Sequence, residues 1–381
     1  ILEEKNRHSF FDNEQSIYDI AVDYEFSKAN FTDAFDYAEE SRSRSLLDLQ
    51  NSAIQVSTNE MQPQINFSEN LSNPLKLAQI QNEMPENTQL LAYSVSPEKI
   101  LIWLITKNSV NTATAEISSE ILQEKISDYL KLVSSNVEPI EQLKLSRELH
   151  QVLISPIKDR LNINKQIFII PDKILFRLSF ATLYEERYLI EDYKISYSPS
   201  ANVFLNCSKK AKELSMKTSE TLLSIGNPTF NKAEYENILQ SLPSAKNEAE
   251  EIAENYENPL VFTQESATKE KVKENLKNAD IFHFAGHYVV DEKTPMLSSL
   301  VLAGEKKEES RFANYEIIGE RLSNTRLIVL SACETGVEKY YKGEGMIGAS
   351  RTFLAMNIPL VVASQWAVDS TATKELMVSF H

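Results

Sequence analysis

The sequence has few glycines, and they are confined to one part of the chain. Its 381 residues contain eight, all between Gly226 and Gly348. Glycine is used where the backbone turns tightly or approaches another group closely. We therefore expect any catalytic chemistry to lie between residues 226 and 348.

Cysteine and long apolar runs are equally scarce. The two cysteines, Cys207 and Cys333, and the five histidines lack the spacing of a structural zinc site. Such cysteine usage is typical of a reducing, cytoplasmic setting. No run of 18 apolar residues predicts a membrane span, and no secretory signal opens the sequence. The polar first residues resemble the interior of a helix, as in a fragment of a longer protein.

Basic charge is also in deficit. The formal net charge is −16 at pH 7. Binding to a phosphate backbone needs a basic stripe, so we expect no direct contact with nucleic acid.

The pattern along the chain predicts four regions. Residues 15–50 contain apolar side chains at three- and four-residue steps, which indicates that residues 1–60 are the end of a helical repeat region. Residues 51–74 are polar and aperiodic, which predicts a linker or mobile loop, and we assign residues 61–84 as the linker between regions. Residues 85–215 open with a β-hairpin signal, and residues 216–381 alternate strands with helices.

Alternation of apolar strands with helices predicts a parallel sheet that is covered on both faces. Sites in such sheets lie at the carboxyl ends of the strands. His287 and Cys333 follow two consecutive strands of this reading. A lone cysteine is more often a buried apolar residue than a nucleophile. The small residues around Cys333 and the adjacent histidine favour a reactive thiol, whereas Cys207 has neither neighbour.

Two further motifs predict no cofactor. His283 and His287 have helical metal-ligand spacing, but on a strand they lie about 13 Å apart at ~3.3 Å per residue. His283 is therefore expected to be a hydrogen-bonded core residue, and we predict no metal.

Residues 343–348 match a dinucleotide-binding pattern, with Asp369 about 20 residues further on. The polar stretch 337–342 separates them from the preceding strand, so we predict a mobile loop there, then a helix over 346–356.

Five segments in this order resemble one known family. They are HFAGH (283–287), LVLAGE (300–305), LIVLSACETG (327–336), GEGMIGASRTFL (343–354) and VVASQWAVD (361–369). Together they resemble the CHAT domain, a caspase-like module found behind tetratricopeptide repeats. Residues 85–215 resemble its degenerate pseudo-caspase half, and residues 36–50 resemble the last helices before it. The resemblance implies an α/β fold: a caspase-like parallel sheet flanked by helices, preceded by a pseudo-caspase α/β half and a helical tail.

The resemblance also implies the cysteine peptidase chemistry of clan CD, which includes caspases and separase. Carried over by position, His287 is the general base and Cys333 the nucleophile. The backbone N–H groups of Tyr288 and Cys333 would form the oxyanion hole. The clan commonly has glycine at the position of Tyr288, so a glycine-only conformation there would strain the backbone.

The implied function is regulated cleavage of a specific protein partner in prokaryotic defence or signalling. The implied substrate is a gasdermin-like protein or another defence effector, and an activating partner would bind the helical repeats. The alternative is a catalytically silent scaffold with the same fold. By resemblance to separase, Trp366 and Asp369 would line a substrate pocket for a basic P1 residue. Asp369 could instead cap the final helix.

Overall fold

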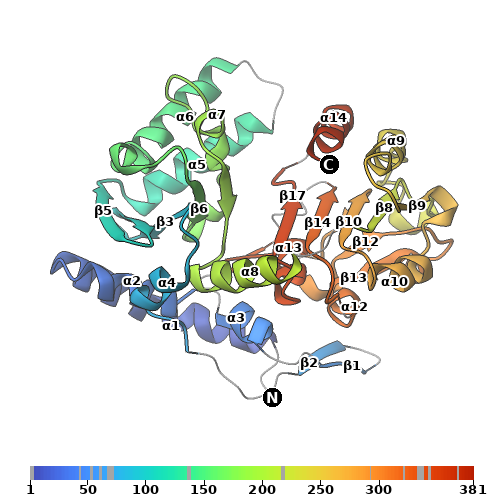
Figure 1. The fold of residues 1–381 in the computed structure, drawn as a ribbon, viewed down its shortest axis with the longest axis horizontal. Helices are drawn as coiled ribbons and strands as arrows, with labels where there is room; N and C mark the ends of the chain where they lie inside the picture. The colour runs from blue at the N-terminus through green and yellow to red at the C-terminus, as the bar shows by residue number, and fades with distance from the viewer. Residues whose placement is uncertain are drawn as a thin grey trace.

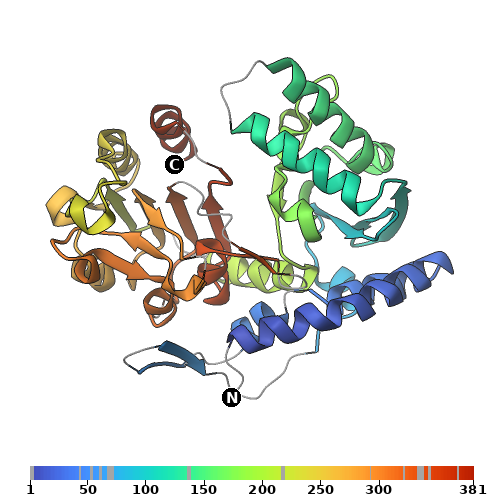
Figure 2. The ribbon, with the colours of Figure 1, turned by 180° about the vertical axis from the view of Figure 1, so that it is seen from behind.

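The computed structural model describes residues 4–42, 44–51, 55–59, 62–66, 73–134, 139–215, 219–291, 293–320, 322–332, 339–341, 345–366 and 369–381. Within these ranges, no helix is both long and apolar enough to cross a lipid bilayer. Two five-stranded sheets dominate the molecule, one from each half of the chain (Figures 1 and 2).

The amino-terminal part is helical, with one small hairpin. Its elements are α1 (Glu4–Ser27), α2 (Phe31–Glu40), α3 (Arg44–Asn51), β1 (Gln55–Asn59), β2 (Gln62–Asn66) and α4 (Leu77–Glu83). Strands β1 and β2 pair antiparallel. The interpretation of the whole stretch 51–74 as a linker or mobile loop is therefore wrong over these two strands.

The first sheet is mixed, with the strand order β5-β4-β3-β6-β7. Strands β3 and β6 pair parallel, whereas β4 pairs antiparallel with both of its neighbours, β3 and β5. Every residue of β3 is buried, because helices cover both faces of this strand. Its elements are β3 (Thr88–Val95), β4 (Ile100–Thr106), β5 (Ser109–Ala115), α5 (Ser119–Val133), α6 (Pro139–Leu153), β6 (Gln166–Ile170), α7 (Leu189–Asp192), β7 (Ile195–Tyr197) and α8 (Ala201–Leu214).

The amino-terminal helices share a hydrophobic core with the first sheet. Trp103 of β4 is fully buried, and its ring lies edge-on to Phe26, with centroids 5.2 Å apart. Phe35 of α2 contacts the same indole at a centroid distance of 6.0 Å. Burying aromatic rings of this size stabilises both elements together. Helices α1 and α2 are thus part of the same folded unit as the first sheet.

The second sheet is entirely parallel, with the strand order β17-β14-β10-β8-β9. Helices α9 and α14 cover one face, and α10, α12 and α13 cover the other. The expected parallel sheet flanked by helices is confirmed. Its elements are β8 (Leu222–Gly226), α9 (Pro243–Ala253), β9 (Leu260–Thr263), α10 (Lys269–Leu276), β10 (Ile281–Ala285), α12 (Asn314–Ile318), β14 (Leu327–Ser331), α13 (Ala349–Ala355), β17 (Leu360–Ala363) and α14 (Ser370–Phe380).

Short elements surround the carboxyl edge of the second sheet. Strands β11 (Tyr288–Val289), β12 (Ser299–Val301) and β13 (Arg311–Ala313) form an antiparallel sheet, and α11 spans Lys307–Ser310. Strands β15 (Lys339–Tyr341) and β16 (Gly345–Ile347) also pair antiparallel. The expected mobile loop over 337–342 is therefore wrong at residues 339–341, and the helix begins at Ala349 rather than at residue 346. The 3₁₀ turns are η1 (Lys158–Arg160), η2 (Lys173–Arg177), η3 (Phe180–Thr182), η4 (Lys232–Tyr235), η5 (Gln264–Ser266) and η6 (Pro295–Leu297).

Helices α3 and α8 join the two halves. Helix α8 extends across the middle of the molecule toward α13 (Figure 1), and α3 contacts both α8 and α13. The Gln50 side chain donates to the Leu354 carbonyl at 2.9 Å and accepts from Asn206 at 3.1 Å. Asn357 donates to the Gln50 carbonyl at 2.7 Å. Helix α3 is therefore hydrogen-bonded to α13, the helix that follows β16.

Candidate active site

The strand register places the two predicted catalytic positions at one edge of the sheet. Strands β10 and β14 are parallel, with Ala285 opposite Ser331, and the Gly286 N–H donates to the Ser331 carbonyl at 3.3 Å. His287 comes two residues after the end of β10. Ala332, which directly precedes Cys333, is buried at the end of β14. Cys333 itself lies outside the described residues.

The backbone around His287 is fixed by the small antiparallel sheet. The His287 carbonyl accepts from the Val301 N–H at 2.9 Å, next to the pairing of Tyr288 with Leu300. Gly286 forms the turn between β10 and β11. A β-carbon at this position would lie 2.7 Å from the ring of Phe284, which is fully buried. The turn therefore needs a residue without a side chain.

The imidazole of His287 is oriented by a backbone group from another loop. Its Nε2–H donates to the Gln240 carbonyl at 2.6 Å. A carbonyl can only accept, so this bond places a proton on Nε2. In the neutral imidazole, Nδ1 is then the basic nitrogen, and it has no hydrogen-bond partner among the described residues. The ring also lies edge-on to Phe230, with centroids 5.8 Å apart.

The protonation of His287 suits a base. Partial burial holds its pKa below the ordinary value of 6.5, and the hydrogen bond to the Gln240 carbonyl opposes this effect. The neutral form therefore dominates at pH 7. A neutral imidazole with a fixed Nε2–H can accept a proton at Nδ1.

Tyr288 lies in the core without backbone strain. Its backbone φ is not in the left-handed region, so the strain expected for a non-glycine residue here is absent. The side chain is 9% exposed, and its hydroxyl accepts from the Asn314 side chain at 2.9 Å. Tyrosine therefore fits this position.

Trp366 and Asp369 follow β17, whose last residue, Ala363, pairs with Leu330 of β14. Both are thus near the same carboxyl edge as His287. Trp366 is half-buried, but Asp369 is exposed. The Asp369 carboxylate accepts from the N–H groups of Thr371 and Ala372 at 3.0 and 2.9 Å, which caps α14. The helix-capping alternative for Asp369 is therefore confirmed, and its role in a substrate pocket stays a prediction.

His283 lies within β10, in a hydrogen-bonded chain through the core. It is fully buried, and its Nε2–H donates to Glu248 at 3.0 Å. Its Nδ1 accepts from Nε2 of His381 at 3.2 Å, and Nδ1 of His381 accepts from the Tyr256 hydroxyl at 2.8 Å. His283 is therefore a satisfied core residue, as expected. No group of three or more His, Cys, Asp or Glu side chains in the described ranges is arranged to hold a metal ion.

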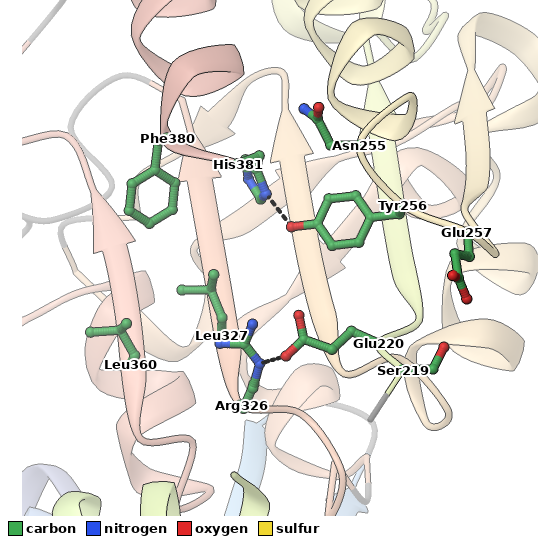
Figure 3. A pocket seen from close by; sticks show the side chains of 10 residues that line it. All are labelled: Ser219, Glu220, Asn255, Tyr256, Glu257, Arg326, Leu327, Leu360, Phe380 and His381. Atoms are coloured by element: carbon green, nitrogen blue, oxygen red, sulfur yellow. Dashed lines mark hydrogen bonds and ion pairs between the residues drawn. The ribbon is translucent and has the colours of Figure 1, made fainter. Parts of the chain in front are cut away.

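A pocket of about 540 Å³ lies at the opposite, amino-terminal edge of the sheet. Figure 3 shows that Tyr256 and His381 meet on one side of it, while Glu220 and Arg326 form an ion pair near the starts of β8 and β14. His287 is at the other end of these strands. This pocket is therefore separate from the candidate active site.

Comparison with known proteins identifies the family. The CHAT domain model matches residues 143–381, which is more than half of the chain, so this protein belongs to the CHAT domain family. Tetratricopeptide repeat protein 28 from Homo sapiens is 25% identical over 283 residues, which are 62% of this chain and 11% of that protein. The chain therefore spans a small part of the length of that relative. The predicted membership of the CHAT domain family is confirmed.

Two solved structures of the separase–securin complex from Saccharomyces cerevisiae are also similar. They have TM-scores of 0.49 and 0.47, and each is 10% identical to this protein. Each comparison covers 78% of this chain, and 27% and 28% of the other chain.

Sequence reasoning missed the Gln240 carbonyl and the loop that carries it. A backbone carbonyl has no signature in the amino-acid sequence, because every residue has one. One available signal was Gly226-Asn227-Pro228, which directly follows an apolar strand at the same sheet edge.

Proposed function

We propose that this protein is a regulated cysteine endopeptidase in which His287 is the general base and Cys333 the nucleophile. The observation that carries the proposal is the placement of His287. A half-buried, neutral imidazole stands at the end of β10, in register with the strand that leads into Cys333, and has a fixed Nε2–H. Membership of the CHAT family supports the same chemistry.

The reaction follows from these roles. Nδ1 of His287 takes the proton of the Cys333 thiol, and the thiolate attacks the scissile carbonyl carbon. Backbone N–H groups of Tyr288 and Cys333 would stabilise the oxyanion. The C–N bond breaks as His287 returns the proton to the leaving amine, which leaves a thioester on Cys333. Water then hydrolyses the thioester with His287 again as the base, and the free thiol is restored.

Regulation would act through α3. Gln50 connects this helix to α13 and α8 by hydrogen bonds, and α13 directly follows the β15–β16 hairpin. A partner that binds the amino-terminal helices can therefore shift the segment between Cys333 and α13. The substrate would be a specific protein, such as a gasdermin-like or other defence effector, and the site of action would be the cytoplasm.

A thiol-reactive activity-based probe tests the catalytic assignment. We expect covalent labelling of the wild type and none of Cys333→Ala, with protein folding checked by circular dichroism. Cys207→Ser is the matched control, because burial raises the pKa of the Cys207 thiol to about 11 and leaves almost no thiolate at pH 7. Equal labelling of wild type and Cys333→Ala would contradict the assignment, and a wild type that never reacts would indicate a silent scaffold.

The same measurement tests regulation. We expect the isolated protein to label slowly, because the proposed activating partner is not bound to the amino-terminal helices. A labelling rate already at its maximum without any partner would rule out control through α3.

A further inference from the structure

The loop that carries Gln240 has bonds of its own, such as Lys232 to the Gln240 side chain at 3.0 Å, and one side chain connects it to the end of β8. Asn227 directly follows β8, and its Oδ1 accepts from the Leu242 N–H at 2.8 Å. Its Nδ2 also donates to the Ser241 hydroxyl at 3.2 Å. Both partners are neighbours of Gln240 in the sequence. The side chain therefore fixes the backbone immediately after the carbonyl that binds His287.

Asn227 is itself fixed to the strand that leads into His287. Its N–H donates to the Ala285 carbonyl at 2.9 Å, and Ala285 is the last residue of β10. The connection forms a closed ring: Ala285 binds Asn227, Asn227 binds Leu242, and the Gln240 carbonyl binds His287. Only Gly286 lies between Ala285 and His287, the two ends of this ring, so a shift of the loop changes the orientation of the imidazole.

The local backbone shows why asparagine occupies this position. Asn227 has a φ of 46°, in the left-handed region that asparagine tolerates better than most residues. It is 8% exposed, so its polar side chain has lost water and needs its hydrogen bonds. A β-carbon on the preceding Gly226 would lie 2.6 Å from Ala249 Cβ of α9. Close packing of α9 on the end of β8 brings Leu242, the residue before that helix, within reach.

We infer that Asn227 is a positioning residue for His287, which acts by holding the Gln240 carbonyl against Nε2. The expected fall in turnover rests on the proposed function, whereas the expected change in the tautomer and orientation of the imidazole does not. Without the Asn227 side chain, the 240–242 segment loses its anchor at the sheet edge, and the Nε2–H bond weakens. The imidazole then divides between its two tautomers and samples orientations in which Nδ1 is misplaced. Misplacement of a catalytic group by about 1 Å can reduce turnover about 100-fold.

The test combines nuclear magnetic resonance with kinetics on the full chain. Asn227→Gly removes the side chain and keeps the left-handed backbone at no steric cost. Asn231→Gly is the matched control, since Asn231 also lies on this loop but its side chain accepts from Ala233 instead. The tautomer of His287 is read from the ¹⁵N shifts of labelled histidine, assigned with His287→Gln. We expect the wild type and Asn231→Gly to hold the Nε2–H form, and Asn227→Gly to show a mixture of both.

The kinetic readout separates positioning from substrate binding. We expect kcat of Asn227→Gly to fall between 10- and 100-fold with little change in KM. Should Asn227→Gly fail to fold, Ser241→Ala removes only the 3.2 Å bond and should give a smaller shift in the same direction. Tautomer populations unchanged from the control would overturn the inference. A shift of tautomer in a protein without any turnover would support the positioning role and count against the proposed peptidase instead.

Discussion

The residues at the carboxyl edges of the two sheets differ in how fully they are hydrogen-bonded. In the first sheet, Asp172 comes two residues after the end of β6, and its carboxylate accepts from the Val95 N–H at 2.8 Å. Lys173 then donates to Asp19 of α1 and to the Val95 carbonyl at 2.8 and 2.5 Å. In the second sheet, Gly286 and His287 directly follow β10, and the imidazole keeps a basic nitrogen without a partner in the described structure. One edge is closed by internal bonds, and the other retains a group that can react.

The difference lies in the residues that follow the strands, not in how the central strands are packed. Both sheets bury their central strands between helices, so the packing requirement is the same in each. The first edge uses charged side chains to bind α1 and carries no glycine. The second uses glycines where the backbone turns beside His287. The two edges therefore differ in the residues that follow the strands, although the central strands are buried in the same way.

The largest expected effect is the loss of cleavage when a proposed catalytic residue at the carboxyl edge of the second sheet is replaced. His287→Ala and Cys333→Ala should each reduce turnover by roughly 10³-fold or more, because base and nucleophile act as one unit. The double variant should be no slower than either single one. Turnover is measured with the cleaved partner protein under identical conditions. Additive losses in the double variant would show that the two residues act independently.

A substitution at the carboxyl edge of the first sheet should affect stability instead of cleavage. Asp172 is 7% exposed, so Asp172→Ala leaves the buried Val95 N–H without its acceptor. We expect the free energy of unfolding to fall by about 1–3 kcal/mol, measured with urea. Asp172→Asn keeps an acceptor oxygen and should lose less. The rate of probe labelling at Cys333 should stay at the wild-type value, and a large drop in that rate would mean that the first edge also serves the active site.

The smallest effect concerns Asp369. Asp369→Ala should cost about 1 kcal/mol of stability because the cap of α14 is lost, whereas Asp369→Asn keeps a capping side chain. If Asp369 also lines the proposed P1 pocket, Asp369→Asn should cleave substrates with Arg or Lys at P1 less well and leave neutral ones unaffected. A peptide series varied at P1 measures this difference. If Asp369→Asn lowers the rates for basic and neutral P1 residues by the same factor, Asp369 only caps the helix.

The sequence was most informative where apolar side chains follow a clear period. The buried strands β10 and β14 are short apolar runs, so their positions and their shared edge could be predicted. Strands β1 and β2 could not, because their residues are polar and the pairing depends on backbone groups. The same limit applies to β15, which lies within a polar stretch.

The candidate site was predictable only as far as its side chains. His287 follows an apolar strand and stands beside a glycine, which are both visible in the sequence. Its hydrogen bond to Gln240 links residues 47 positions apart through a backbone carbonyl, and no residue type specifies such a contact. The sequence also did not show that tyrosine fits at position 288, because the fit depends on the pairing of β11 with β12 and on the hydrogen bond from Asn314.

The contact between α2 and α8 limits how this protein can be divided. The buried Glu39 carboxylate accepts from the N–H groups of Ala201 and Asn202 at the first turn of α8, at 3.0–3.2 Å. Helix α8 has 14 residues, or about 21 Å at 1.5 Å per residue, and extends toward the second sheet. An engineered fusion that replaces the amino-terminal helices would remove this acceptor and expose the core around Trp103. New sensor modules should therefore be joined upstream of α1, not between the helices and the first sheet.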